Sequence, residues 1–159
     1  MVDRLAADAA ALHAALNELV RVYQFRDRDR ICCHDVSVTQ CYAIEALVRR
    51  GPSGLNELAA ELYLDKSTAS RVVATLRRKG YVARAAHPED GRAVVLSVTP
   101  AGRRLHDRIR KDLVAEAREL LKDVEPDVRE GAARLIRGLA RAAAARSGVA
   151  GPSCCGTEE

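Results

Sequence analysis

The most constraining feature of this sequence is the succession of hydrophobic patterns between residues 55 and 102. Two stretches with apolar residues at helical spacing come first, and two short β-rich stretches follow them. The first helical pattern consists of Leu55, Leu58, Ala59 and Leu62, and the second consists of Ala69, Val72, Val73 and Leu76. A helix, a turn, a second helix and a two-stranded ribbon in this order predict a winged helix-turn-helix.

Capping residues indicate where these two helices begin and end. Ser53 is the expected N-cap of the first helix and Asp65 that of the second, because short polar side chains accept hydrogen bonds from the first backbone N–H groups of a helix. Gly80 follows three consecutive cations at positions 77–79, which is typical of a helix C-terminus. The second helix should therefore begin near Lys66 and end just before Gly80, its left-handed cap.

The face of the second helix opposite its apolar residues is small, polar and basic. It carries Lys66, Ser67, Ser70, Arg71, Ala74 and Arg78. Short hydroxyl side chains let a helix approach the DNA major groove, where Ser67 and Ser70 can reach bases or phosphates and Arg71 can donate two hydrogen bonds to a guanine. An ordinary solvated face has a similar composition, so the interpretation depends on the neighbouring elements.

A polar connection at residues 87–92 joins the β-rich stretches at residues 81–84 and 93–98. It is too long for a two-residue hairpin turn, so we expect a protruding loop, the wing. Arg92 at the base of this loop can enter a minor groove or contact a phosphate.

Together these residues resemble the DNA-binding core of the MarR family of bacterial transcription regulators. The similarity lies in the helix opening DKSTASR, the helix end LRRKGYV, the wing residues Asp90, Gly91 and Arg92, and the exit from Val98 to Gly102, which is similar to an LTxxG motif. The resemblance implies major-groove and phosphate contacts from Ser67, Thr68, Ser70 and Arg71, beside Lys66, and a minor-groove contact from Arg92. It also implies that Asp90 holds this arginine in place.

Long apolar stripes flank this unit. One runs through residues 3–26, and the charged run at residues 26–30 closes the predicted helix. Thr99 and Pro100 start a helix of about six turns, and residues 126–147 form a last one. These helices are too long to be covered by so small a domain, so we expect them to pair between two chains, as the terminal helices of the resembled family do.

The expected fold is therefore mostly α-helical with a small β-wing, an α+β winged helix-turn-helix flanked by dimerisation helices. The 159 residues suit a single domain at residues 1–147. Within it, the DNA-binding lobe spans residues 37–100, and the dimerisation helices span residues 3–30 and 100–147. The Gly-rich segment 148–159 is expected to be a disordered tail.

Composition limits the class of protein further. No apolar run approaches the ~20 residues that a membrane span needs, and early charges interrupt the region where a signal peptide would lie, so we expect a cytoplasmic protein. The net charge of +4 is a weak argument for nucleic acid, whereas the clustering of Lys and Arg around the second helix is a better one. Cys33 and His34 lack a third orienting group, so an enzyme is not expected.

Five cysteines form two groups, each with an adjacent pair: Cys32, Cys33 and Cys41 in one, and Cys154 and Cys155 in the other. Structural disulfides are not expected in a reducing cytosol. Thiolates select soft ions, and a helix N-terminus lowers the pKa of a thiol such as Cys41. We favour a site for As(III), which binds three sulfur atoms; antimonite, mercury and copper(I) fit nearly as well, and zinc is disfavoured although His34 could assist.

Two other interpretations of the cysteines remain open. One is a redox switch, in which an oxidised cysteine forms a disulfide with a second one. In the other, Cys41 is a small buried residue near Val36 and the regulator responds to a small organic ligand, which the aromatic content of 3% makes less attractive.

These expectations define a homodimeric repressor on a pseudopalindromic DNA operator, released when cysteine thiolates bind a metalloid. A protein-interaction module that uses the winged helix without DNA is the alternative from another class.

Overall fold

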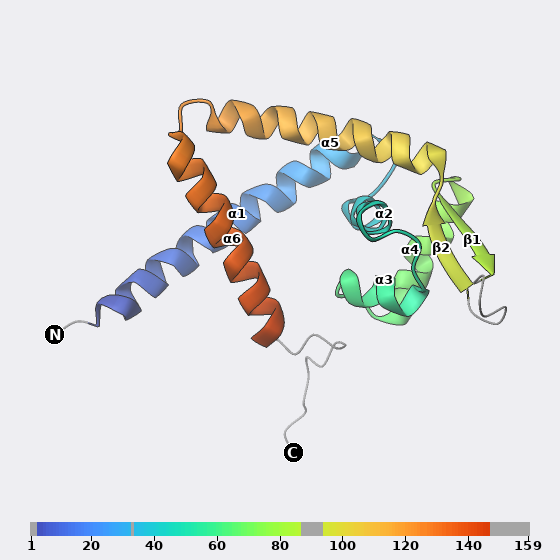
Figure 1. Ribbon diagram of the computed structural model, residues 1–159, viewed down its shortest axis with the longest axis horizontal. Helices are drawn as coiled ribbons and strands as arrows, with labels where there is room; N and C mark the ends of the chain where they lie inside the picture. Colours follow the sequence, from blue (N-terminus) through green and yellow to red (C-terminus); the bar gives the residue numbers. More distant parts are fainter. Residues whose placement is uncertain (1–2, 33, 87–93, 147–159) are drawn as a thin grey trace, which may run out of the picture. The chain divides into compact units, whose positions relative to one another are not determined.

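The computed structural model describes residues 3–32, 34–86 and 94–146, without the side chains of residues 26–30 and 32 (Figure 1). In this part of the chain the order of elements is α1 (Arg4–Cys32), α2 (Val38–Arg50), α3 (Leu55–Glu61), α4 (Lys66–Arg78), β1 (Val82–Ala86), β2 (Val94–Val98), α5 (Pro100–Leu121) and α6 (Pro126–Arg146). The predicted fold class, mostly helical with one small sheet, is confirmed.

The chain divides into two compact units, Met1–Val38 with α1 and Thr39–Glu159 with the remaining elements. Within the second unit, α3 contacts α4 and β2, α4 also contacts β1, and β2 contacts α5. The helix-turn-helix and the strand pair therefore form one packed lobe.

α1 extends further than predicted. The charged run at residues 26–30 was expected to close the helix, but α1 continues to Cys32. Neither glycine nor proline occurs before Gly51, and charged side chains are compatible with a helix, so nothing in the run interrupts the backbone hydrogen bonds. The helix ends just before Asp35, whose φ of +62° is left-handed, a conformation that aspartate tolerates better than most residues.

The start of α3 also differs from the prediction. Gly54, not Ser53, is the N-cap, and its N–H donates to Glu57 Oε2 at 2.9 Å. Ser53 instead pairs with Leu96 of β2, through Ser53 N to Leu96 O at 3.0 Å and Leu96 N to Ser53 O at 2.9 Å. Ser53 is the N-cap that local preference favours. Because Ser53 pairs with a strand that is distant in sequence, Gly54 is the N-cap instead.

The boundaries of α4 are as predicted. Asp65 is the N-cap, and its side chain accepts from Thr68 N. At the other end Gly80 has a φ of +77°, and the N–H groups of Gly80 and Tyr81 donate to the carbonyls of Arg77 and Leu76. This is the Schellman arrangement, which satisfies carbonyls at the end of a helix.

β1 and β2 form an antiparallel pair with Val82 opposite Val98 and Ala86 opposite Val94. β1 thus begins one residue later than the stretch predicted at 81–84 and ends two residues later. The wing loop, with Asp90 and Arg92, lies outside the described residues.

The exit from β2 is locked to the end of α4. Thr99 Oγ1 donates to Gly80 O at 2.7 Å and accepts from Gly102 N at 3.1 Å, while Thr99 N donates to Tyr81 O at 3.0 Å. A Cβ on Gly102 would lie 2.2 Å from Tyr81 O, so only glycine fits here. The threonine and glycine of the exit motif are therefore required by backbone contacts.

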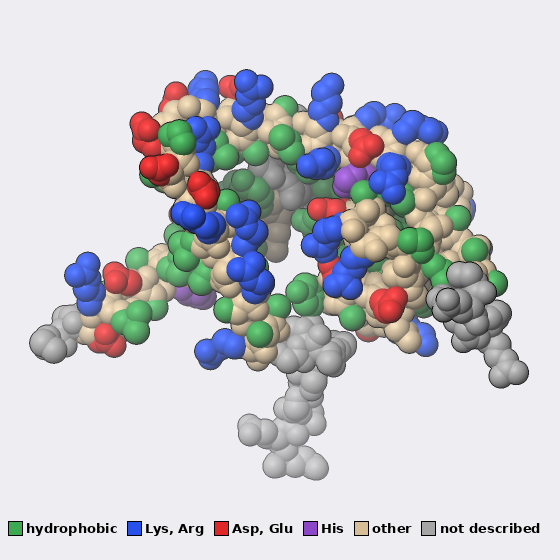
Figure 2. Space-filling view, in the orientation of Figure 1, with side chains coloured by type: hydrophobic (Ala, Val, Ile, Leu, Met, Phe, Trp, Pro, Cys, Tyr) green, Lys and Arg blue, Asp and Glu red, His purple; other side chains and the backbone are tan. Residues whose placement is uncertain are grey.

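Large apolar residues of the terminal helices remain exposed. α6 has no buried residue, and Leu135 and Ile136 are 57% and 50% exposed. On α1, the exposed large apolar residues are Leu5, Leu12, Leu19, Val20, Val22, Tyr23 and Phe25. Figure 2 shows hydrophobic side chains on the surface of α5 and α6 beside Lys and Arg side chains.

Candidate nucleic-acid interface

α4 separates its residues into a packing face and an exposed face. Ala69, Val73 and Leu76 are buried at 0%, 6% and 0% exposure. The residues predicted opposite them are all exposed: Lys66, Ser67, Ser70, Arg71, Ala74 and Arg78. The helix therefore presents a continuous polar and basic surface of the kind that enters a major groove.

The side chain of Asp65 organises the first turn of this surface. Asp65 Oδ1 accepts from Ser67 Oγ at 2.7 Å and from Thr68 N at 2.8 Å, and Asp65 Oδ2 accepts from Thr68 Oγ1 at 2.7 Å. The hydrogen bonds from Ser67 and then from Thr68 hold the pKa of Asp65 well below its usual range. Asp65 is therefore a carboxylate that only accepts.

Arg71 is tied to the same turn. Its Nη2 donates to Thr68 Oγ1 at 3.1 Å, so that one threonine hydroxyl lies between the carboxylate of Asp65 and the guanidinium of Arg71. The sequence pattern predicts these side chains as independent contacts. The structure links them in one chain of hydrogen bonds.

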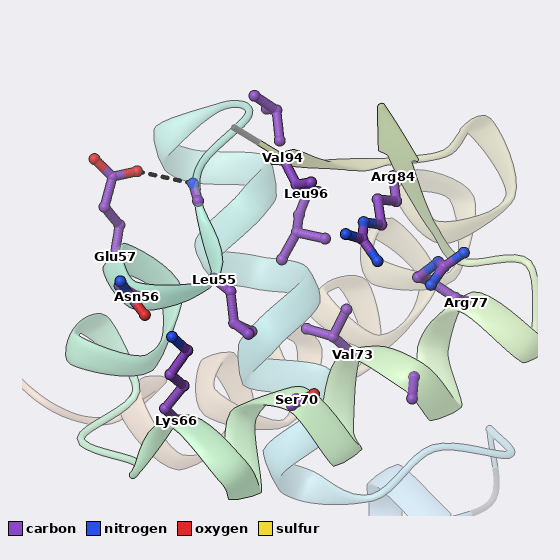
Figure 3. Close-up of a pocket in the computed structure, with 13 residues that line it drawn as sticks. Leu55, Asn56, Glu57, Lys66, Ser70, Val73, Arg77, Arg84, Val94 and Leu96 are labelled. Carbon is purple, nitrogen blue, oxygen red and sulfur yellow. Dashed lines mark hydrogen bonds between the residues drawn. The ribbon is translucent and has the colours of Figure 1, made fainter. Parts of the chain in front are cut away.

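A cavity of about 700 Å³ lies beside α4, between α3, α4 and the strands (Figure 3). Its lining includes Lys66, Ser70 and Arg77 from α4 and Arg84 from β1. Figure 3 shows Arg77 and Arg84 approaching the same side of the cavity from the helix and from the strand.

Neither Arg77 nor Arg84 is among the residues predicted from the sequence to contact DNA. Both side chains are exposed, and neither forms an ion pair within the described part of the chain. Lys66, Ser70, Ala74 and Arg77 recur at helical spacing along one side of α4, which is the sequence signal that could have placed Arg77. The proximity of Arg84 depends on how β1 packs on α4.

The predicted cysteine site is only partly described. Cys41 lies in the first turns of α2 with 6% of its surface exposed. Cys32 is in the last turn of α1, beyond the helix predicted at residues 3–30, while Cys33, Cys154 and Cys155 lie outside the described residues. Over the described ranges, no group of three or more His, Cys, Asp or Glu residues has the arrangement of a metal site.

Among the helices described, none is long and apolar enough to cross a membrane.

The paired helices, the strand hairpin and the exposed face of α4 define a winged helix-turn-helix DNA-binding protein. A family model described as "MarR family" matches residues 34–93. An uncharacterised HTH-type transcriptional regulator of Mycobacterium bovis is 33% identical over 142 residues, which cover 87% of this chain and 96% of the relative. The chain belongs to the MarR family of transcription regulators.

Solved structures have the same fold. A MarR family protein from Bacillus stearothermophilus matches with a TM-score of 0.77 at 21% identity, over 85% of this chain and 94% of that one. The PcaV transcriptional regulator from Streptomyces coelicolor, in complex with its natural ligand, matches with a TM-score of 0.62 at 26% identity, over 80% of this chain and 92% of that one.

Proposed function

We propose that this protein is a homodimeric repressor that inserts α4 of each chain into the major groove of a pseudopalindromic operator. The observation that carries the proposal is the exposed face of α4, where Lys66, Ser67, Ser70 and Arg71 are accessible while Ala69, Val73 and Leu76 are buried. An arginine such as Arg71 discriminates guanine because it can donate to both guanine O6 and N7.

Contacts with phosphates position α4 in the groove. Arg77 and Arg84 are exposed cations on the same side of one cavity (Figure 3), and Lys66 lies at the start of α4. Phosphate contacts fix the register of a protein on a duplex without reading its sequence. Arg92, held by Asp90, supplies a minor-groove contact from the wing.

The uncovered apolar residues of the terminal helices support the proposed dimer. Leu120 on α5 and Leu135 and Ile136 on α6 are each at least half exposed, whereas comparable residues of the lobe are buried. A two-fold dimer places two recognition helices about 34 Å apart, one turn of DNA, and this spacing requires a pseudopalindrome.

The test of the DNA-binding proposal is selection of duplexes from a randomised pool by the full-length reduced protein. The expected product is an inverted repeat with a guanine in each half-site. Arg71→Ala should lose preference for that guanine by about tenfold, since a bidentate pair contributes roughly 1–3 kcal/mol of discrimination. Arg110→Ala, which removes an exposed cation of α5, is the matched control and should retain the preference. Equal behaviour of the two variants would contradict the proposal. Selection of no preferred duplex would contradict it as well, and this is the outcome expected of a protein-interaction module that does not use DNA.

The inducer in this proposal is arsenite or another thiophilic ion, bound by Cys32, Cys33 and Cys41 and assisted by Cys154 and Cys155. Adjacent cysteine pairs in a short chain support it, because thiolates select soft ions. Cys41 is buried, so an ion that binds it must draw this thiol out of the core. Ligation is thereby coupled to a change of α2, and an ion that favours the changed state lowers DNA affinity.

Two alternatives predict a different inducer. In a redox switch, oxidation forms a disulfide between two of the cysteines. In the second alternative a small organic molecule is the inducer, which is supported by the ligand-bound state of the similar PcaV regulator.

An operator-shift titration separates these inducers. Arsenite, zinc and hydrogen peroxide are added in parallel to the reduced protein on its selected duplex, and reductant is added at the end. Release of the protein from the duplex at near-stoichiometric arsenite supports the metalloid sensor. Release by peroxide alone, with binding restored by reductant, supports the redox switch. The triple variant Cys32→Ser, Cys33→Ser, Cys41→Ser should resist arsenite. The double variant Cys154→Ser, Cys155→Ser keeps these three ligands and measures how much the second cysteine pair assists. If arsenite still releases the triple variant from the duplex, the proposed cysteine site is wrong.

A further inference from the structure

The first turn of α4 has more internal hydrogen bonds than a helix cap requires. A cap needs one side-chain oxygen that accepts from a backbone N–H, and Asp65 Oδ1 does this with Thr68 N at 2.8 Å. The two further bonds, from Ser67 Oγ and from Thr68 Oγ1, both at 2.7 Å, engage two of the hydroxyl groups that α4 would present to DNA. These bonds change what the hydroxyls can offer to a base.

The direction of each bond follows from chemistry. A carboxylate has no hydrogen to donate, so Ser67 and Thr68 must both point their hydroxyl hydrogens at Asp65. Each hydroxyl oxygen then has only lone pairs left. Thr68 Oγ1 uses one of them to accept from Arg71 Nη2 at 3.1 Å.

We propose that Asp65 is a positioning residue for DNA reading, which directs Arg71 to guanine through Thr68 and leaves Ser67 able only to accept from a base amino group. The proposal rests on the proposed function, in which α4 enters the major groove. In that groove the amino donors are adenine N6 and cytosine N4. Ser67 should therefore face an adenine or a cytosine. Neither Ser67 nor Thr68 should donate to a phosphate, although the family resemblance implies phosphate contacts for both.

Asp65→Asn tests this because it keeps the shape of the side chain while it changes the hydrogen-bond polarity of one atom and removes the charge. Asparagine is as good an N-cap as aspartate, and its carbonyl oxygen can still accept from Thr68 N. The amide N–H₂ that replaces Oδ2 donates to Thr68 Oγ1 instead of accepting from it. The threonine hydrogen must then point elsewhere. Thr68 Oγ1 keeps a lone pair for Arg71, but without the carboxylate behind the hydroxyl its bond to the guanidinium is weaker.

The measurement uses full-length protein and the duplex that the wild type selects from randomised DNA, with each base pair of a half-site exchanged in turn. Arg71→Ala identifies the guanine that Arg71 reads. Thr68→Val, which deletes the hydroxyl, should reduce discrimination at that guanine about tenfold, and Asp65→Asn should reduce it by less, while Thr68→Ser should retain it. Ser67→Ala should remove the preference for adenine or cytosine at a separate position.

A second readout separates positioning from mere support of the helix. Asp65→Asn removes a negative charge next to DNA, so its affinity for a random duplex should stay the same or rise at low salt while guanine discrimination falls. A change that only weakened α4 would lower the affinity for the selected duplex and the affinity for a random duplex alike. Thermal unfolding followed by circular dichroism should give a midpoint close to the wild-type value for Asp65→Asn, and Thr68→Val carries the test if it does not, because its backbone N–H still reaches Asp65.

Two results would overturn the proposal in different ways. If Arg71→Ala keeps the wild-type base preferences, the proposal that α4 reads DNA is wrong, and so is the role of Asp65 inferred from it. If Arg71→Ala loses the guanine preference while Asp65→Asn and Thr68→Val both keep it, only the role of Asp65 is wrong.

Discussion

The winged lobe and the terminal helices use hydrophobic residues differently. In the lobe, the apolar residues of α2, α3 and α4 fill a core that contains Ile44, Leu47, Leu58 and Leu76, each at most 2% exposed. In α6 the apolar residues follow an equally regular helical pattern, yet none of its residues is buried. Burial of apolar surface is the main favourable term in folding, so the lobe is complete within one chain and the terminal helices are not.

The largest expected effect tests the lobe directly. Leu76→Ala empties a fully buried position and should lower the free energy of unfolding by about 3 kcal/mol, as large-to-small substitutions in a core do. Urea unfolding should give this loss at every protein concentration, because the cavity lies within one chain. A loss below about 1 kcal/mol would mean that the lobe is not the self-sufficient core.

The matched change in the terminal helices is Leu135→Ala, at a residue that is 57% exposed in the single chain. It should act on association, raising the dissociation constant of the proposed dimer at least about tenfold, since a buried leucine contributes roughly 1.5–3 kcal/mol. Analytical ultracentrifugation over a dilution series measures this. An unchanged constant would place the dimer contacts elsewhere.

Two glycines give a second comparison between the regions. Gly102→Ala should cost about 2–3 kcal/mol of unfolding free energy, because the new Cβ would overlap with the backbone of Tyr81. Gly131→Ala on α6 meets nothing within 4 Å and should stabilise the helix by about 0.5–1 kcal/mol. Thermal melts of the two variants should therefore shift in opposite directions, and shifts of the same sign would contradict the packing at the exit motif.

A smaller effect is expected at the ion pairs between α2 and α3. Glu61 pairs with Arg49 and Arg50, with the Arg50 Nη2 to Glu61 Oε2 distance at 2.8 Å. The arginines are largely exposed, so Glu61→Gln should cost no more than about 1 kcal/mol and less in high salt. Unfolding measured at two salt concentrations checks this, and a salt-independent loss would point to packing instead.

The smallest change concerns strain in the turn between α3 and α4. Tyr63 is exposed and has a φ of +53°, a left-handed conformation that is unfavourable for a residue with a Cβ. Tyr63→Gly should raise the unfolding free energy by about 0.5 kcal/mol, after the greater freedom of glycine in the unfolded chain is subtracted. Calorimetry should detect a small rise in the melting temperature, and a fall would mean that the tyrosine ring contributes more than its exposure indicates.

Sequence patterns predicted most elements because their determinants are local. The apolar spacing of α4, its Asp65 cap and the left-handed Gly80 all depend on residues within a few positions of one another, and all are confirmed. The closing of α1 at its charged run was wrong, since charge alone does not interrupt backbone hydrogen bonding. The contacts assigned to Lys66, Ser67, Thr68, Ser70 and Arg71 stay predictions, although the exposure of the face that carries them is established.

The sequence by itself determined which segments are helices and strands, which face of α4 is polar, and that apolar stripes extend beyond the lobe. Only the tertiary structure decided that Ser53 pairs with Leu96, that Gly102 lies against Tyr81, and that Arg77 and Arg84 border one cavity. Spacing along the chain encodes interactions over one or two helical turns. Contacts between residues far apart in sequence depend instead on how completed elements pack, because only packing brings their backbones and charges together.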